Sequence, residues 1–226
     1  MTGTSERIGA HIDPAGRMEL IEIGERAGTG ACVDFRRIEL AGISSQPLVK
    51  ACGPKGLLVD ATAGFGGDAW ILAAAGFDVT CIERSLVVAA VLDDGISRAK
   101  TDPALAAVAK RIELKVGEAA HLLAKVLPED ARRHATLYLD PMYPPKEGSA
   151  LAPKPIRLIR LAVGDGPDAA ELVAAGRAAH YRRIVVKRPH HAPHLDGTPH
   201  HEIEGKLARF DVYISHTTNG RTGPSE

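Results

Sequence analysis

The sequence predicts an α/β fold in which a mostly parallel sheet is covered by helices and closed by a C-terminal antiparallel hairpin. From Leu57 onward, short apolar runs of strand length alternate with segments of helix length, as in strand-helix-strand units with right-handed crossovers. Hydrophobic residues make up 45% of the chain and aromatic residues only 4%. The core should therefore consist mainly of Ala, Val, Leu and Ile, which suits a buried parallel sheet.

The region before this alternation is predicted to form a small separate unit. Residues 1–16 are polar and contain glycine, so we expect a loose lead-in there. Two β-type runs follow at residues 18–24 and 31–35, and the glycines between them favour a turn. We expect a small N-terminal β hairpin, with residues 1–38 as an extension and residues 39–226 as the main domain.

The elements of the main domain follow from patterns of apolar residues and from helix-ending signals. Gly53 and Pro54 end a short helix predicted over Gln46–Cys52. We then expect, in order, a strand at 57–60, a helix at 68–75, a strand at 77–83, a helix capped by Ser85, a strand at 111–116, a helix through 121–127, a strand at 135–140, a long loop, a helix at 168–180 and a strand at 182–187. The run HEIEG and residues 210–216 are too close for a crossover, so they predict the terminal hairpin.

Charge and cysteine content narrow the class of protein. Lys plus Arg and Asp plus Glu number 28 each, so any nucleic-acid surface must be local. Cys32, Cys52 and Cys81 lack CxxC spacing and read as packing residues in a reducing compartment. No apolar run is long enough to span a bilayer, and the N-terminus lacks the pattern of a signal peptide. We expect a cytoplasmic protein.

A glycine-rich loop, DATAGFGGD, follows the first strand of the alternation and opens into a helix. Such a turn lets the backbone approach a nucleotide-like ligand. Glu83 ends the next strand, where a carboxylate can accept hydrogen bonds from both ribose hydroxyls of an adenosine. The alternatives are a plain tight turn and a surface acid paired with Arg84. A nicotinamide-dependent oxidoreductase would use the same loop and acid, but its last strand is ordinarily parallel.

The fourth strand of the alternation ends in the motif YLDPMYPPK. Its prolines remove backbone donors, so the chain must leave the sheet in a stiff, extended turn. This brings the Asp140 carboxylate, the Pro141 carbonyl and the Tyr143 ring to the carboxyl edge of the sheet. Two acceptors and a stacking ring suit a planar base with an exocyclic amine. The alternative is a rigid proline turn with a buried tyrosine.

Five motifs together indicate a family. They are VDATAGFGGDAW, ERSLVVAAVLDDGISRA (83–99), YLDPMYPPK with SAL (149–151), VVKRP (185–189) and RFDVYIS (209–215). In order and spacing they resemble the RsmJ family, S-adenosylmethionine (SAM)-dependent methyltransferases that act on a guanine of 16S small-subunit ribosomal RNA. The resemblance implies a Rossmann-like class I methyltransferase fold, SAM as cofactor, and methylation of the exocyclic 2-amino group. Another amino-group methyltransferase, acting on adenine or cytosine, would share the Asp-Pro-x-Tyr element.

The resemblance also implies roles for single residues. By matching motif, it implies cofactor contacts at Gly67, Asp68, Glu83, Arg84, Glu118, Ala119 and Asp140; from the glycine loop itself we add Asp60, Gly64 and Gly66. Asp140, Pro141 and Tyr143 are expected to hold the target base. The family usually carries a basic residue at the position of Gly67 and small hydroxyl residues near 118 and 119, and the segment between Phe35 and Leu57 is shorter here.

The expected partner is small-subunit ribosomal RNA or a partly assembled subunit, with no obligate protein partner. Basic residues near the proline motif are candidate phosphate contacts: Lys146, Lys154, Arg157, Arg160, Lys187 and Arg188. Their alternative is an ordinary solvated basic surface, and a non-catalytic RNA-binding protein is a further alternative for the whole chain. Five histidines lie between residues 190 and 201, but prolines interrupt them and no Cys or paired acid joins them. We predict no metal there.

Overall fold

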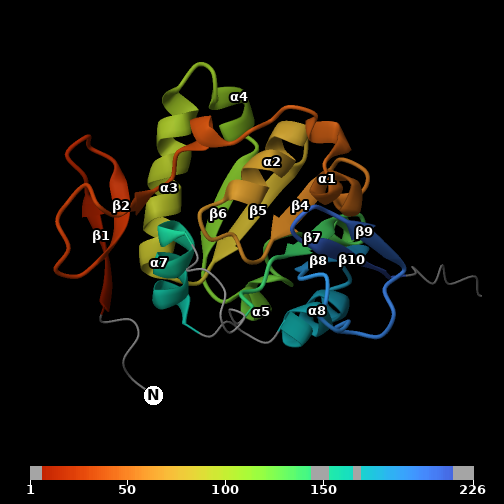
Figure 1. Ribbon diagram of the computed structural model, residues 1–226. Coiled ribbons are helices and arrows are strands. Elements are labelled where there is room, and N and C mark those ends of the chain that lie inside the picture. The colour runs from red at the N-terminus through yellow and green to blue at the C-terminus, as the bar shows by residue number, and fades with distance from the viewer. Residues whose placement is uncertain (1–6, 144–152, 165–168, 216–226) are drawn as a thin grey trace, which may run out of the picture.

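A seven-stranded sheet forms the centre of the computed structural model, which describes residues 7–143, 153–164 and 169–215 (Figure 1). Its strands are β4 (Leu57–Asp60), β5 (Asp78–Glu83), β6 (Ile112–Val116), β7 (Thr136–Leu139), β8 (Arg183–Arg188), β9 (His201–Glu204) and β10 (Arg209–Ile214). They lie in the order β6-β5-β4-β7-β8-β10-β9. Strands β4 to β8 are parallel, and β10 pairs antiparallel with both β8 and β9. The predicted α/β fold with a closing hairpin is confirmed.

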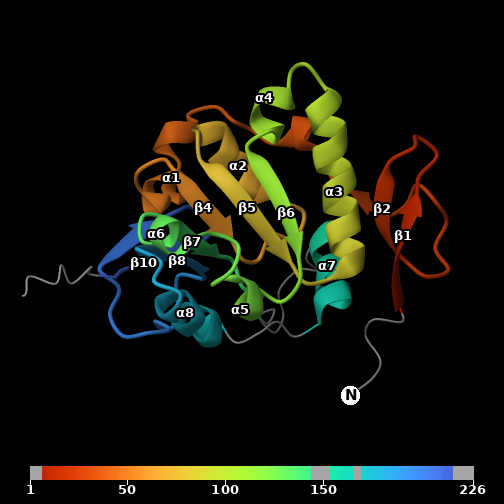
Figure 2. The same ribbon diagram turned by 180° about the vertical axis from the view of Figure 1, so that it is seen from behind.

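Successive strand residues enter two different hydrophobic cores, as expected for a sheet buried on both faces. On β4, Leu58 belongs to one core and Val59 to the other; on β7, Tyr138 and Leu139 alternate in the same way. Helices α1 (Pro47–Cys52), α2 (Gly67–Ala75) and α3 (Leu86–Thr101) cover the first face, and α5 (Ala119–Leu122), α6 (Glu129–Arg132) and α8 (Ala169–Ala178) cover the second (Figures 1 and 2). The helix α4 (Ala106–Ala109) follows α3. In the described part of the chain, no helix is long and apolar enough to cross a membrane.

The N-terminal region forms a three-stranded antiparallel sheet, which contains the predicted hairpin as β2 (Met18–Glu22) and β3 (Ala31–Cys32) and adds one further strand, β1 (Ile8–Ile12). The strands lie in the order β1-β2-β3. The loose lead-in predicted over residues 1–16 was therefore wrong for β1, whose outer residues are exposed and show no apolar alternation. The strand forms because it pairs with β2 along its whole length. The run predicted over 31–35 ends at Cys32, because the Asp34 side chain caps a short 3-10 helix that starts at Phe35.

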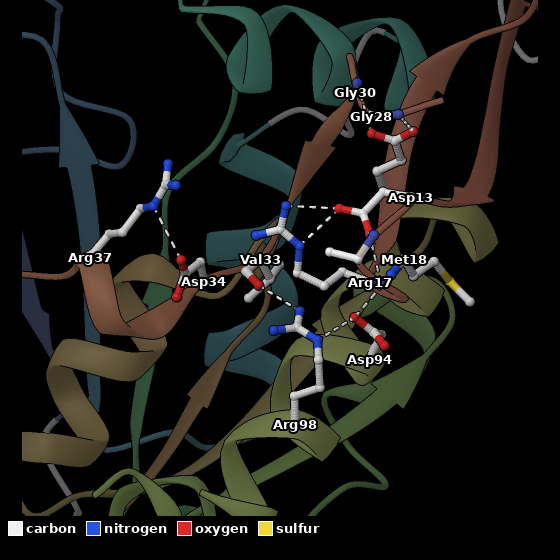
Figure 3. Close-up of polar contacts among 12 residues, drawn as sticks. Asp13, Arg17, Met18, Gly28, Gly30, Val33, Asp34, Arg37, Asp94 and Arg98 are labelled. Carbon is white, nitrogen blue, oxygen red and sulfur yellow. Dashed lines mark hydrogen bonds and ion pairs between the residues drawn. The ribbon is translucent and has the colours of Figure 1, made fainter. Parts of the chain in front are cut away.

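This N-terminal sheet packs on α3 and on α7 (Lys154–Val163), beside the main sheet (Figure 1). Leu20 and Val33 join the first hydrophobic core. Polar contacts add to the apolar packing, as Figure 3 shows: the Arg98 guanidinium donates to the Val33 carbonyl (2.6 Å) and to Asp94 (2.8 Å), which in turn accepts from the backbone N–H of Met18 (3.2 Å). The sheet is thus attached to the domain that carries the site.

Two further predictions about the elements were wrong. The long loop after β7 contains α7, so the chain between β7 and α8 is not simply extended. The helix expected through 121–127 ends at Leu122, because the next backbone carbonyls, those of Ala124 and Leu127, accept hydrogen bonds from the buried Arg132 guanidinium instead of from a helical turn. Ser85 stands at the N-cap of α3 as predicted, but its side chain makes no capping hydrogen bond.

Candidate active site

A cleft lies at the carboxyl ends of β4, β5, β6 and β7. The strand order changes direction between β4 and β7, and open parallel sheets bind ligands at such a point. The predicted residues that line the cleft are Gly64, Glu83, Arg84, Glu118, Ala119, Asp140 and Pro141; Thr62, Met142 and, from α7, Ile159 and Val163 line it as well. Asp60, Gly66, Gly67, Asp68 and Tyr143 are not part of the lining.

The glycine loop turns sharply between β4 and α2. Gly64 has a φ of 53° and Gly66 a φ of 72°, conformations that residues with a Cβ rarely adopt. A Cβ at Gly66 would lie 2.7 Å from Cδ1 of Leu92, so α3 packs directly against the loop. Gly67 begins α2, and a Cβ there would meet no atom of the described residues within 4 Å. That position therefore has room for a larger side chain.

Glu83 is buried at the end of β5 and holds the glycine loop in place. Its Oε2 accepts a hydrogen bond from the backbone N–H of Gly64 (3.0 Å), and its Oε1 accepts one from Ser85 (2.8 Å). Burial raises the pKa of Glu83, and the two backbone N–H groups oppose that rise. Each carboxylate oxygen keeps a further lone pair, so the residue can also accept hydrogen bonds from a ligand in the cleft.

Arg84, Glu118 and Ala119 complete this side of the cleft. The Arg84 guanidinium donates to the Val163 carbonyl of α7 and lies 4.0 Å from the Glu118 carboxylate. Glu118 is exposed, whereas Ala119 is buried at the start of α5. The helix α7, which we did not predict from the sequence, therefore contacts Arg84, one of the predicted cofactor residues.

Asp140 leaves β7 beside the loop that follows β4. Its backbone N–H donates to the Thr62 hydroxyl (2.7 Å), and the backbone N–H of Thr62 donates to Asp60 (3.0 Å). Asp60 is buried, and burial raises its pKa to about 7. Thr62 was missed in the sequence, because a threonine in a glycine-rich loop gives no signal of a bond to a residue that follows it by 78 positions.

Tyr143 lies next to the cleft rather than in its lining. Its hydroxyl donates to the Lys187 carbonyl (3.2 Å), and its own carbonyl accepts from the Arg160 guanidinium (2.9 Å). The Arg188 guanidinium lies over the ring, 5.0 Å from its centroid. Burial raises the pKa of Tyr143 to about 12, so the phenol stays neutral, and Arg188 covers one face of its ring.

A charged network joins α2, β7 and β8. The Lys187 ammonium lies 2.8 Å from Oδ2 of Asp68 and 2.9 Å from Oδ2 of Asp140. The Tyr138 hydroxyl donates to the same oxygen of Asp68 (2.5 Å). Burial alone would lower the pKa of Lys187, but the carboxylates of Asp68 and Asp140 outweigh it, and the pKa is raised. Lys187 was predicted as a phosphate contact, and its place in this network was not anticipated.

Comparison with known proteins decides the family. The model of the family described as "Putative SAM-dependent methyltransferase" matches residues 16–215. "Ribosomal RNA small subunit methyltransferase J" of Ectopseudomonas mendocina is 41% identical over 87% of this chain and 78% of its own length, and the protein of that name from Thioalkalivibrio sulfidiphilus is 45% identical over 76% and 69%. The chain belongs to the ribosomal RNA small subunit methyltransferase J family. The resemblance found in the sequence is thereby confirmed.

A solved structure of the same kind supports the fold of this methyltransferase. A SAM-dependent methyltransferase from Neisseria gonorrhoeae is 30% identical, with a TM-score of 0.63 over 90% of this chain and 81% of that chain. SAM is the cofactor of this family, and the nicotinamide-dependent alternative is wrong. The cleft fits such a group, since a glycine turn with positive φ at Gly64 and the Glu83 carboxylate lie side by side in it.

The cationic residues predicted to contact RNA in this methyltransferase lie in different surroundings. Lys146 falls outside the described residues, as does the SAL motif. Lys154 pairs with Glu25 of the N-terminal region (2.9 Å), and Arg160 and Arg188 are engaged at Tyr143. The side chain of Arg157, half-buried on α7, has no ion pair or hydrogen bond with the described residues.

The His-rich segment lies at the carboxyl end of β8. Ligand atoms of His194, Glu202 and Asp211 lie within 4.8 Å of one another, as a metal site would require. Arg209, however, donates to both carboxylate oxygens of Asp211 (2.7 and 3.1 Å) and also to the carbonyls of His190 and Ala192. An internal cation thus already pairs with Asp211, one of the two acids of this cluster.

Proposed function

We propose that this methyltransferase transfers a methyl group to the exocyclic 2-amino group of a guanine in 16S small-subunit ribosomal RNA. The names of its relatives support ribosomal RNA as the substrate. One observation carries the proposal most directly: the cofactor residues Gly64 and Glu83 and the base-binding residues Asp140 and Pro141 line one cleft. A donor and an acceptor bound to these two sides would be neighbours, which is the main requirement of a transfer reaction.

The cofactor half of the cleft is assigned by its chemistry. Glu83 would accept hydrogen bonds from the ribose hydroxyls of SAM, and the backbone at Gly64, Gly117 and Ala119 would allow close approach of the adenosine. Asp60 and Asp68 are proposed to act from behind the lining. When bound, SAM supplies a methyl group on a positively charged sulfur, so the protein needs to align the acceptor more than to activate it.

The acceptor half binds and orients the amine. We assign the two N–H groups of the guanine 2-amino group to the Asp140 carboxylate and the Pro141 carbonyl, which leaves the nitrogen facing the cofactor half. The Tyr143 ring would stack on the base. As the new N–C bond forms, the bond between the methyl carbon and the cofactor sulfur would break and leave a neutral thioether; the amine would lose a proton, and Asp140 is placed to accept it. Alignment of this kind contributes roughly 7–11 kcal/mol in favourable intramolecular reactions.

The RNA must present an unstacked guanine to reach Asp140. We infer that the substrate is free small-subunit RNA or a partly assembled subunit in the cytoplasm. Arg157, Lys154 and Arg160 lie on α7 and, with Arg188 and Lys146, are proposed to contact phosphates around the base. Because the chain as a whole carries no net charge, this contact should be local, and binding should weaken as salt increases.

Single-turnover methyl transfer by Asp140→Asn tests the assignment. We expect the rate to fall by about a hundredfold or more, with SAM affinity within about threefold of wild type. Asp78→Asn is the matched control, since Asp78 is exposed at the opposite edge of the sheet. Near-normal transfer by Asp140→Asn would refute the role of Asp140. Mass mapping of small-subunit RNA after gene deletion and add-back identifies the base, and a methylated adenine or cytosine would favour the alternative amino-group methyltransferase.

A further inference from the structure

Lys187 is placed to control the carboxylate on which the proposed reaction depends. Its ammonium bridges one oxygen of Asp68 and one oxygen of Asp140 at 2.8 and 2.9 Å. Oδ1 of Asp140 has no hydrogen-bond partner among the described residues. One carboxylate oxygen is therefore held by the protein, and the other remains for the amine of the base.

The ammonium itself is fixed from two sides. Asp68 is held by the Tyr138 hydroxyl at 2.5 Å, and Tyr138 is fully buried in the sheet. Lys187 lies on β8, paired with Phe210 of β10, so its backbone cannot shift without disturbing the sheet. A lysine restrained in this way acts as a fixed positive charge and not as a mobile surface group.

The charges at this point explain why a cation is needed. The titratable groups that face Asp140 are Asp60 from β4, Asp68 from α2, Tyr138 and Tyr143 at the two sides of the β7 exit, and Lys187 from β8. Without the lysine, several acids would share a buried space, and one would take up a proton. With it, the ammonium between the two carboxylates offsets part of their charge, and the Asp140 carboxylate can stabilise the positive charge that develops on the amine as it attacks the methyl group.

We propose that Lys187 is a positioning residue for methyl transfer, which keeps Asp140 ionised and turns its free oxygen toward the amine. This inference rests on the proposed role of Asp140. It differs from the earlier prediction of a phosphate contact, because a side chain bound to two carboxylates has little charge left to offer RNA. A positioning role for Lys187 predicts a change in kcat and its pH profile, whereas a phosphate contact predicts a change in KM for RNA.

The experiment compares Lys187→Met and Lys187→Arg with Lys110→Met, an exposed lysine just before β6 at the far edge of the sheet. Methyl transfer to small-subunit RNA is measured at saturating SAM as a function of pH. For Lys187→Met we expect kcat to fall about tenfold to a hundredfold and the acid limb of kcat to move up by about one pH unit, with KM for RNA nearly unchanged. Lys187→Arg should restore most of kcat, and Lys110→Met should match wild type.

Asp68→Asn provides a second test, in which the pH profile is expected to shift in the opposite direction. This test does not depend on whether Lys187→Met folds. It removes the competing carboxylate, so Lys187 acts on Asp140 alone and the acid limb should move to lower pH. A raised KM with an unmoved pH profile in Lys187→Met would overturn the inference in favour of a phosphate contact, and so would an unmoved limb in Asp68→Asn. If Asp140→Asn is fully active, the proposed role of Asp140 fails, and the inference about Lys187 fails with it; if wild type methylates no guanine of small-subunit RNA, the proposed function itself fails. If Asp140→Asn is inactive while Lys187→Met behaves as wild type, only the inference about Lys187 fails.

Discussion

The Thr62 hydroxyl accepts a hydrogen bond from the backbone N–H of Asp140 at 2.7 Å, which links the glycine loop to the exit of β7. The two segments carry opposite halves of the cleft. Beyond the pairing of β4 with β7 and the bond from the Ala61 N–H to the Tyr138 carbonyl, this side-chain oxygen helps to set their relative position, and with it the distance between donor and acceptor.

Thr62→Val removes that oxygen with almost no change in shape. The Asp140 N–H loses its partner, so we expect the free energy of unfolding to fall by about 1–3 kcal/mol and kcat by about tenfold. Thr62→Ser keeps the hydroxyl and should retain both. Urea denaturation and single-turnover kinetics measure the two effects, and equal activity of the valine and serine variants would disprove the link.

Asp60 gives the protein a pH-dependent stability. Its pKa is about 7 when folded and 3.8 in the reference state, so the folded protein binds the extra proton between those values. Stability from this group is present below pH 3.8 and is lost as pH rises through 7. Asp60→Asn has no titrating carboxyl at this position, so its stability lacks this dependence on pH. Relative to the variant, wild type should lose up to about 4 kcal/mol across the interval, measured by urea denaturation at several pH values. A constant difference would contradict the prediction.

The two neighbouring glycines should respond differently to alanine. Gly66→Ala introduces a Cβ at positive φ and 2.7 Å from Leu92, so we expect a loss of about 2 kcal/mol or more. Gly67→Ala adds a Cβ in open space at the start of α2 and should leave stability equal or up to about 1 kcal/mol higher. Thermal denaturation of both variants tests the contrast. A similar loss in both would show that the loop is not restrained as described.

Arg98 should hold the N-terminal sheet more firmly than Arg37 does, although both make ion pairs in this region (Figure 3). Arg98→Ala leaves the Val33 carbonyl and Asp94 without their partner, at an expected cost of about 1–3 kcal/mol. Arg37 is 80% exposed in its pair with Asp34, so Arg37→Ala should cost less than about 0.5 kcal/mol. Hydrogen exchange over residues 8–32 should accelerate only in the first variant.

The strands of the main domain were predictable from sequence because a parallel sheet buried on both faces needs continuous apolar runs such as Leu57–Asp60 and Thr136–Leu139. The strand β1 was not, since only Ile8 of its five residues is buried and its structure depends on pairing with β2. The helix α7 follows a proline-rich stretch and begins at Lys154 with Pro155 in its first turn, so local signals favoured a loop.

The cleft residues could be predicted from sequence motifs because they directly follow strands. The role of Lys187 was not, because a lysine at a strand end looks the same whether it faces solvent or two carboxylates. Only the packing of α2 beside β7 and β8 brings Asp68 and Asp140 within reach of one ammonium.

The place of β10 between β8 and β9 also sets an order of assembly. As the chain is synthesised, β9 emerges before β10, its partner within the described residues, and the outer edge of β8 stays open for the same interval. The sheet can therefore be built as far as β8 before β10 is available to complete it. Until Arg209–Ile214 has been made, β9 lacks this partner and β8 pairs on one side alone, and open strand edges of this kind tend to associate with other chains.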